Sequence, residues 1–331
     1  MSAQTVPIHY VHRMLRVAER RGFDVVPLLR DAGIPEDVAG HAKARITVGQ
    51  FGRAARRLLV LTDDELFGLG PRVPRGTFRL IGLSLIHAPD LRTVLGRLAD
   101  ASAVLAGVPR ITVTENGGQT TLAADVSALD DPEHLGAEVV ATLAHRFSGW
   151  LIGRRIALRA VELPYPEPAY ALDYYPILGR MPLFGAERVA LTFDSVLLAA
   201  PLVRSEADLL AYIDLMPGNF FATRDHGSTT ADRVRKILEG GLRGTWPTSH
   251  EIAARLAVSV QHLRRMLREE KTSVGRIREE LLRDAAITSL ARGEEPVEDL
   301  ARRLGYSEAS AFRRAFRRWT GSPPGAYRPT H

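Results

Sequence analysis

The sequence predicts an α+β N-terminal domain followed by an all-α C-terminal domain that contains two helix-turn-helix units joined by a long helix. Three observations predict this fold. Apolar residues at helical spacing dominate the first hundred residues, and alternating patterns typical of strands follow. In the last hundred residues, one pattern of helix, turn and helix occurs twice. At 331 residues the chain exceeds one typical domain, so two domains are expected.

The composition indicates a globular protein. An apolar content of 45% and a charged content of 25% are typical of that class. The chain has no cysteine, which excludes disulfides and thiol chemistry and fits a reducing cytoplasm. No apolar run is long enough to span a bilayer, and the N-terminus has early charges and lacks the apolar segment of a signal peptide. We therefore expect a cytoplasmic protein without a membrane partner.

The net charge of +6 is unevenly distributed along the chain. From Gly227 to the end there are 20 Lys and Arg and 13 Asp and Glu, a balance of +7. The rest of the chain has 24 basic and 25 acidic residues, a balance of −1. A basic segment beside a near-neutral one predicts a polyanion-binding module attached to another domain.

The beginning of the chain is predicted to be mostly helical. Apolar residues follow helical spacing through much of residues 5–65, which include a short helix that ends at Gly33. The run from 71 to 104 is also helix-like, with an interruption at Pro89. Asp90 is the expected N-cap of its second part.

Strands are predicted next. Alternating residues on both sides of Asn116-Gly117-Gly118 indicate a β-hairpin. A helix over 132–152 and a strand that ends at Pro164 follow, and we interpret the segments AYALDYYPILG and RVALTFDSVLL as two further strands. We therefore place an α+β domain over residues 1–215 and a polar, turn-rich linker over residues 216–228.

No motif in this part of the chain indicates catalysis. It has no nucleophile motif, zinc pattern or paired carboxylates, and the glycine-rich stretch 68–76 lacks the spacing of a phosphate-binding loop. His9 and His12 lie at i and i+3, but no third ligand is near them, so we expect no metal site. Asp, Tyr and Tyr at positions 173–175 either line a pocket or pack in the core. We expect neither enzyme activity nor a cofactor.

A helix with a basic outer surface is predicted near the C-terminus. Ser307 is its expected N-cap. Phe312, Phe316 and Trp319 recur at i, i+4 and i+7 and form one apolar face. Gly321, followed by two prolines, ends the helix. The preceding PVEDLARRLGY predicts a shorter helix, so the two form a helix-turn-helix unit.

The stretch TSHEIAARLAVSVQHLRRMLREE has the same plan. Ala257-Val258 form the turn, and Ser259 caps a second helix on which Leu263 faces inward. Between the two units, Ser273 to Ala291 predicts one helix of 19 residues. Its length of about 28 Å is comparable with the roughly 34 Å between consecutive major-groove faces of B-DNA. Both outer helices can therefore enter adjacent major grooves.

This C-terminal region closely resembles the DNA-binding module of AraC/XylS-type transcription regulators. The closing pattern G-x-x-P-x-x-Y-R is present as Gly321, Pro324, Tyr327 and Arg328. The resemblance covers about a hundred residues, 229–331, and includes the preceding helix ADRVRKILEGGL. It implies a bacterial, nucleoid-associated transcription regulator that binds double-stranded operator DNA.

The N-terminal domain is similar to the subgroup whose sensor is an arabinose-binding-type domain, typified by ornithine-utilisation regulators. The phrases FRLIGLSLIHAPDLRTVL and LTFDSVLLAAPL carry this similarity. It implies a domain that senses a small-molecule effector and dimerises, but it identifies neither the effector nor the residues that bind it. A homodimer and RNA polymerase are candidate further partners.

The resemblance also implies which side chains contact DNA. Arginine can donate two hydrogen bonds to guanine, and glutamine can pair with adenine. Other basic side chains contact phosphates. For each arginine, a phosphate contact or a solvated charge is the alternative to a base contact. The expected DNA-binding residues are Gln261, Arg264, Arg265 and Arg268 on the first unit, and Ala309, Ser310, Ala311, Arg313, Arg314, Arg317 and Arg318 on the second.

The second unit departs from the family pattern at Ala309 and Ala311, where longer polar side chains are often found. These methyl groups can contact a thymine methyl, or the second unit reads sequence weakly. Two other functions remain open: a constitutive DNA-binding protein whose N-terminal domain only dimerises, and an enzyme domain with a DNA-binding tail. A metabolite that raises the melting temperature would distinguish a sensor from a dimerisation scaffold.

Overall fold

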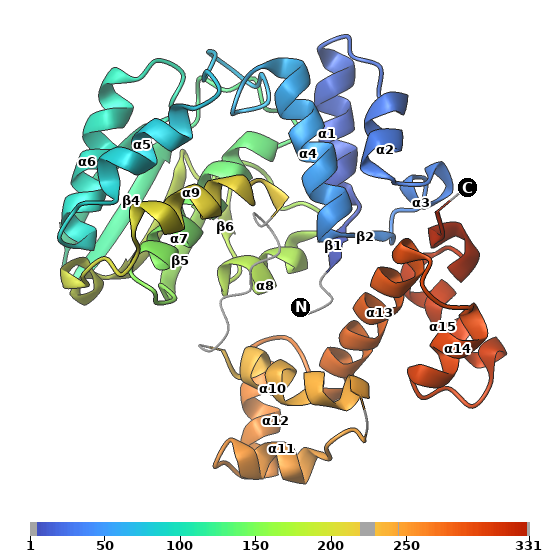
Figure 1. Cartoon of the computed structure of the whole chain (residues 1–331). Coiled ribbons are helices and arrows are strands. Elements are labelled where there is room, and N and C mark those ends of the chain that lie inside the picture. Colours follow the sequence, from blue (N-terminus) through green and yellow to red (C-terminus); the bar gives the residue numbers. More distant parts are fainter. Residues whose placement is uncertain (1–4, 219–228, 244, 330–331) are drawn as a thin grey trace. The chain divides into compact units, whose positions relative to one another are not determined.

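The structure is a computed structural model that describes residues 5–218, 229–243 and 245–329 (Figure 1). Most of the predicted linker, 219–228, lies outside the described residues. The described chain packs as two compact units. The first unit contains the described residues of Met1–His12, Val26–Ala54 and Arg224–His331, and the second those of Arg13–Val25 and Ala55–Thr223. No helix in the described parts is long and apolar enough to cross a membrane.

A five-stranded sheet forms the centre of the second unit. Its strands lie in the order β3-β4-β7-β5-β6, and all neighbours are antiparallel except β5 and β6. The predicted hairpin is confirmed, because Asn116 pairs with Gln119 across two glycines with positive φ. The strand bounds are Arg110–Asn116 for β3, Gln119–Asp125 for β4, Leu158–Leu163 for β5, Leu183–Phe184 for β6 and Val189–Asp194 for β7.

Helices pack on this sheet and share one apolar core with it. Helix α6 contacts β3, and α7 contacts β7. Asp90 is the N-cap of α6, as predicted, since its carboxylate accepts from the backbone N–H of Thr93 at 2.8 Å. The helices are α5 (Thr77–Leu85), α6 (Leu91–Val104), α7 (Leu135–Leu151), α8 (Tyr174–Leu178) and α9 (Glu206–Asp214).

One predicted strand of this unit is wrong. The segment AYALDYYPILG forms a 3-10 turn, Ala171–Asp173, followed by α8. Pro176 has no N–H to donate to a strand ladder but is tolerated in the first turn of a helix. Gly179, with a φ of 76°, ends the helix. The segment RVALTFDSVLL does supply a strand, β7, and the short strand β6 was not predicted.

The N-terminal part of the first unit combines helices with a pair of short strands. The predicted helices are present, but β1 and β2 were not predicted, because three residues give too short an alternating pattern. Val6 and Ile46 pair across the two strands and are both buried. The elements are β1 (Thr5–Pro7), α1 (His9–Arg20), α2 (Val26–Ala32), α3 (Glu36–Ala39), β2 (Arg45–Thr47) and α4 (Val48–Thr62); α1 and α4 continue into the second unit.

The C-terminal part of the first unit is helical, as predicted. The long helix runs from Val274 to Arg292, and the side chain of Ser273 accepts from the backbone N–H of Arg276 at its start. The elements are α10 (Thr230–Glu239), the 3-10 turn η4 (Gly240–Arg243), α11 (Ser249–Arg255), α12 (Val260–Glu269), α13 (Val274–Arg292), α14 (Val297–Arg303), α15 (Ala309–Thr320) and the 3-10 turn η5 (Pro324–Tyr327).

Candidate nucleic-acid interface

The first candidate contact surface lies on the pair α11–α12. Thr248 and Glu251 form a reciprocal capping box at the start of α11. Ala257 lies in the turn with a φ of 55°, and the Ser259 hydroxyl accepts from the backbone N–H of His262 at 3.1 Å. The prediction that Ser259 caps α12 is therefore confirmed.

An apolar cluster supports this pair and determines which face of α12 is exposed. Leu263 and Leu267 of α12 are buried, whereas Gln261, Arg264, Arg265 and Arg268 are exposed on the other faces. The helix therefore presents the predicted side chains to solvent. The cluster is formed by Val234, Leu238, Ile252, Ala253, Leu256, Leu263, Leu267, Ile277 and Leu281.

The exposed residues of α12 differ in their contacts. The Arg265 guanidinium lies 3.1 Å from the Nδ1 atom of His262 and 4.0 Å from the Glu269 carboxylate. Within the described ranges, Gln261, Arg264 and Arg268 form no side-chain hydrogen bond or ion pair. These three side chains thus have no polar partner among the described residues.

The second candidate surface lies on the pair α14–α15. Gly305 forms the turn with a φ of 86°, and Gly321 ends α15 with a φ of 80°. Phe312 and Phe316 are buried, as the apolar spacing predicts. Trp319 is half-buried and donates from its indole N–H to Glu279 of α13 at 2.7 Å.

The predicted N-cap of α15 is wrong. The helix begins at Ala309, so the N-cap position belongs to Glu308, which makes no side-chain capping bond. The first helical hydrogen bonds run from Ala311 and Phe312 to the Glu308 carbonyl, which leaves Ser307 outside the helix. The Ser310 hydroxyl instead donates to the Glu308 carboxylate at 2.9 Å.

The arginines of α15 fall into two groups. Arg313 pairs with Glu298 of α14, and Arg318 donates to Glu279 at 2.8 Å. The Arg318 guanidinium, and after it the Trp319 indole, hold the pKa of the Glu279 carboxyl below its ordinary value. Arg314 and Arg317 are exposed and have no hydrogen bond or ion pair to any described residue.

The small residues at the start of α15 are less accessible than the arginines. Ala309 and Ala311 are half-buried, and Ser310 is exposed. The predicted side chains of this helix therefore lie along one stretch of it, but only Ser310 and the four arginines project into solvent.

The closing motif of the chain has a structural role. Tyr327 is buried and its ring meets that of Phe316 edge-on at 5.1 Å. Arg328 donates to the backbone carbonyl of Glu295, in the loop before α14. These two residues thus fix the end of the chain to the second helix pair.

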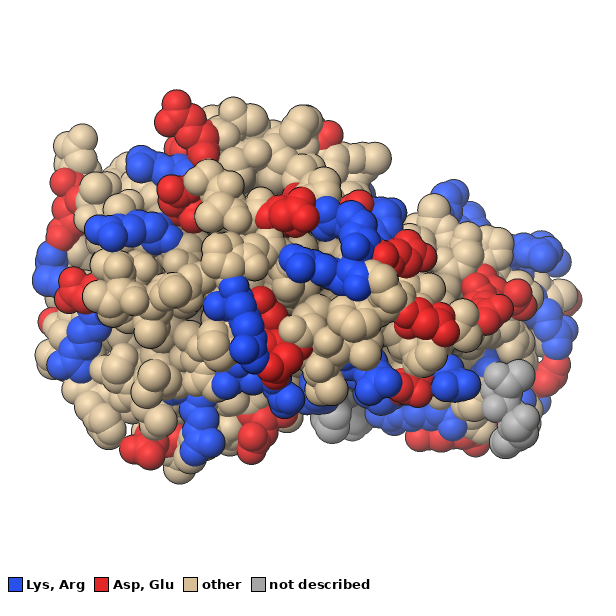
Figure 2. Space-filling model, turned by 90° about the horizontal axis from the view of Figure 1, so that it is seen from above, with Lys and Arg blue, Asp and Glu red and all other residues tan. Residues whose placement is uncertain are grey.

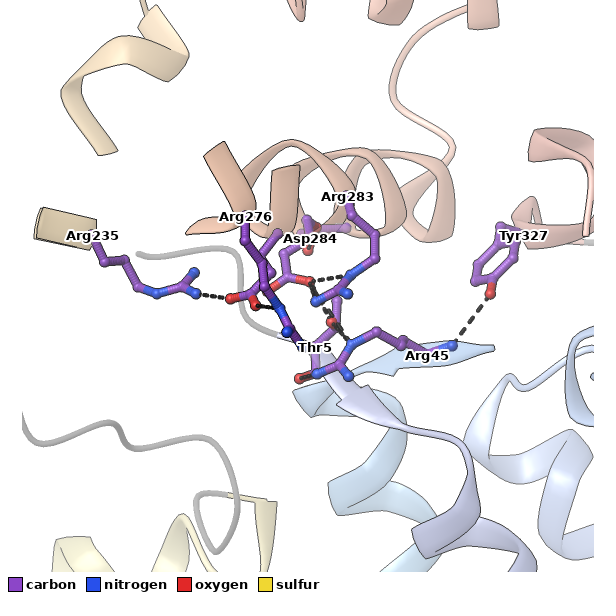
Figure 3. Close-up of polar contacts among 9 residues, drawn as sticks. Thr5, Arg45, Arg235, Arg276, Arg283, Asp284 and Tyr327 are labelled. Atoms are coloured by element: carbon purple, nitrogen blue, oxygen red, sulfur yellow. Dashed lines mark hydrogen bonds and ion pairs between the residues drawn. The ribbon is translucent and has the colours of Figure 1, made fainter. Parts of the chain in front are cut away.

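A polar contact joins α13 to the strands β1 and β2, and sequence reasoning missed it (Figure 3). The Thr5 hydroxyl donates to the buried Asp284 carboxylate at 2.6 Å, and Arg45 donates to the Thr5 hydroxyl and carbonyl, each at 2.8 Å. The backbone N–H of Arg45 also donates to the Tyr327 hydroxyl at 3.4 Å. The signal in the sequence is Asp284 itself, an acidic residue seven positions after Ile277 on the apolar stripe of a helix.

On the face of the molecule shown in Figure 2, basic and acidic side chains are interspersed. The exposed arginines that have no partner among the described residues are Arg264 and Arg268 on α12 and Arg314 and Arg317 on α15.

The candidate metal and pocket residues of the N-terminal part have other partners. The Nε2 atom of His12 lies 2.6 Å from the Ala39 carbonyl. Among the described residues, no group of three or more His, Asp or Glu side chains can hold a metal ion. Tyr174 is buried and its hydroxyl donates to Glu138 at 3.1 Å.

Comparisons with known proteins agree with this geometry. Residues 22–202 match the model of the arabinose-binding domain of AraC transcription regulators, and residues 252–330 match a helix-turn-helix domain. The chain is 23% identical over 330 residues to the ornithine utilization regulator of Pseudomonas aeruginosa. This alignment covers 99% of this chain and 97% of the relative. It is 28% identical over 342 residues to an HTH-type transcriptional regulator of Mycobacterium tuberculosis. That alignment covers 97% of this chain and 95% of the relative.

Among solved structures, the transcriptional regulator CdpR from Pseudomonas aeruginosa aligns over 97% of this chain and 98% of its own, with 21% identity and a TM-score of 0.33. The match to the arabinose-binding model alone extends over more than half of the chain. The protein therefore belongs to the AraC family of DNA-binding transcription regulators, with an N-terminal ligand-binding domain of the arabinose-binding type.

Proposed function

We propose that α11–α12 and α14–α15 are two helix-turn-helix units joined by α13, and that α12 and α15 enter adjacent major grooves of the operator. The observation that carries this proposal is the pair of exposed basic helices at the two ends of a helix of 19 residues. At about 1.5 Å per residue, α13 is roughly 28 Å long, close to one helical turn of DNA.

In this proposal the exposed side chains divide into base-reading and backbone-contacting groups. Base edges are read by Gln261, Arg264 and Arg265 of α12 and by Ala309, Ser310, Ala311, Arg313 and Arg314 of α15. Phosphates are contacted by Arg268, Arg317 and Arg318. Arg264 and Arg314 have no partner to leave among the described residues, whereas Arg265 and Arg313 must release an acidic side chain before they bind a base.

The remaining parts of the chain receive their roles from the same proposal. Residues 1–215 sense a small-molecule effector and form a homodimer. Residues 216–228 connect this domain to residues 229–331, which bind double-stranded DNA. The protein acts at the nucleoid in the bacterial cytoplasm, contacts RNA polymerase and catalyses no reaction. The relative named as an HTH-type transcriptional regulator supports the role in transcription regulation.

The test is a hydroxyl-radical footprint of the full-length protein on genomic DNA recovered with it. The full chain is required because β1 and β2 pack against α13. We expect two protected segments about one helical turn apart on one side of the duplex. Protection of only one major-groove segment would contradict the proposal that both helix-turn-helix units bind DNA.

A further inference from the structure

The loop between α3 and β2, residues 40–44, lies against the end of α15. Both segments belong to the first compact unit. The imidazole of His41 lies 3.4 Å from the position that a Cβ atom would take at Gly321, the residue that ends α15. Helix α3 contacts the turn η5, and the backbone N–H of Arg45 donates to the Tyr327 hydroxyl at 3.4 Å. Two segments far apart in the sequence thus meet at one end of the second helix pair.

Hydrogen bonds fix the conformation of this loop. The backbone N–H of Ala44 donates to the His41 carbonyl at 2.9 Å and closes a tight turn around Lys43. The Ala44 carbonyl in turn accepts from the backbone N–H of Ile8 at 2.9 Å, and Ala44 is 1% exposed. The turn therefore holds Lys43 at a defined place on the surface of this unit.

The loop adjoins the part of α15 that presents arginines without partners. Arg314, Arg317 and Gly321 lie at i, i+3 and i+7, a spacing that places them on one side of the helix. Gly321 follows Arg317 by four residues, which is about 6 Å along the helix axis. The loop therefore touches α15 about one turn beyond Arg317, and it extends the basic surface of this helix at its C-terminal end.

The side chain of Lys43 is free to bind an anion. It is exposed and has no hydrogen bond or ion pair with any described residue. The acidic residues of α3, Glu36 and Asp37, lie in its first turn, at the end of the helix away from the loop. A lysine ammonium is a compact charge on a flexible chain, which suits a phosphate contact better than the reading of a base.

We propose that Lys43 contacts a DNA phosphate beside the major-groove segment that α15 enters. The DNA-binding surface then includes a residue of the N-terminal domain, well outside residues 229–331. This inference rests on the DNA-binding function proposed above, in which Arg317 contacts the backbone at the end of α15. It adds a contact to phosphate and none to a base.

The first test is Lys43→Ala in the full-length protein, titrated against operator and scrambled duplex between about 50 and about 200 mM salt. A phosphate contact carries no sequence information, so binding to both duplexes should weaken alike and the salt slope should fall by about one unit. The advantage of the wild type should therefore shrink roughly threefold across this salt range. The melting temperature should not change, because the Lys43 side chain is exposed and has no described partner.

The matched control is Arg79→Ala. Arg79 lies on α5 in the second unit, is exposed and has no hydrogen bond or ion pair with any described residue. Its removal changes the net charge by the same amount as Lys43→Ala. The salt slope of Arg79→Ala should equal that of the wild type, which separates a local contact from the effect of total charge.

The second test locates the loop on the DNA. The chain contains no cysteine, so a single introduced cysteine can be labelled selectively. Lys43→Cys carrying an iron chelate that cleaves nearby DNA should cut the operator within a few base pairs of the cuts made by labelled Arg317→Cys. Labelled Arg79→Cys should make no cuts there.

Two outcomes would overturn the inference: an unchanged salt slope in Lys43→Ala, or no cleavage by labelled Lys43→Cys where labelled Arg317→Cys cuts. Both leave the proposed function intact, because the two protected segments of the footprint do not depend on Lys43. Absence of cleavage from both labelled variants would instead contradict the docking of α15 itself.

Discussion

The two helix pairs of the C-terminal region follow one sequence plan but are supported differently. The pair α11–α12 packs with α10 and the first half of α13 around one apolar cluster. The second half of α13 carries Asp284, which binds Thr5 of β1, and Tyr327 after α15 accepts from the backbone of Arg45. The comparison indicates that the first pair is the more autonomous, and that the second depends on the N-terminal strands.

Removal of the buried carboxylate should have the largest effect. Asp284→Ala removes a carboxylate that is 3% exposed, accepts from Thr5 and Arg283, and forms an ion pair with Arg45 at 3.9 Å. We expect a loss of about 3–5 kcal/mol in the free energy of unfolding. Hydrogen exchange should increase in α14 and α15 more than in α11 and α12.

The control is Asp299→Ala, which removes an exposed carboxylate that pairs with Arg302 at 3.0 Å. Its cost should be below about 1 kcal/mol. Equal loss of protection in both helix pairs after Asp284→Ala would remove the distinction between them.

The exposed arginines test the comparison at the level of DNA binding. Arg265→Ala, in the first pair, should weaken operator binding by about 1–3 kcal/mol and change binding to scrambled DNA much less. Arg317→Ala, at the end of α15, should weaken binding to both duplexes alike and lower the salt slope by about one unit.

Titrations of each variant against operator and scrambled duplex, at two salt concentrations, measure these effects. The wild-type protein should itself lose affinity steeply with salt, by about 0.9 log units per log unit of salt for each phosphate contact. Equal weakening of both duplexes by Arg265→Ala would place this residue on the backbone and not on a base.

Acid should loosen the second pair. Glu279 accepts from Arg318 and Trp319, and these bonds lower its pKa below the ordinary 4.5. A carboxylate whose pKa is lower in the folded than in the unfolded state stabilises the protein at pH values above its unfolded-state pKa. This contribution is lost as the pH falls through the folded-state pKa. Below pH 4.5, hydrogen exchange in α15 should therefore rise.

The matched variant Glu279→Gln should cost roughly 1 kcal/mol at neutral pH, because the pair is partly exposed. It should also reduce the acid sensitivity of α15. An unchanged pH profile in this variant would show that another group titrates.

Local features of both pairs could be predicted from the sequence, whereas their supports could not. The stripe of Phe312 and Phe316 and the cap at Ser259 depend on residues within two helical turns. The bond between Thr5 and Asp284 joins residues 279 positions apart, and no local pattern encodes such a pairing.

The errors have equally specific causes. The cap of α15 is displaced by one residue, from Ser307 to Glu308, because both residues fit a helix start and hydrogen bonds alone decide between them. In AYALDYYPILG, apolar residues alternate over too few positions to distinguish a strand from the short helix α8. The assignment of DNA-contacting side chains stays a prediction, since exposure is necessary for such a contact but does not identify the base.

The smallest expected effect concerns the turns of the two pairs. Both need a residue with positive φ, and the first has Ala257 at 55° where the second has Gly305 at 86°. The left-handed conformation costs a residue with a Cβ about 1–2 kcal/mol, and glycine avoids this cost at the expense of greater freedom in the unfolded chain. Ala257→Gly should therefore stabilise the protein by about 0.5 kcal/mol. Gly305→Ala should destabilise it by about 1 kcal/mol, and only through the backbone, because a Cβ at this position meets no atom within 4 Å. Urea unfolding of both variants and of the double variant measures the effects, which should be additive because the two turns belong to different helix pairs. A loss of stability in both single variants would mean that the turns differ in more than the identity of one residue.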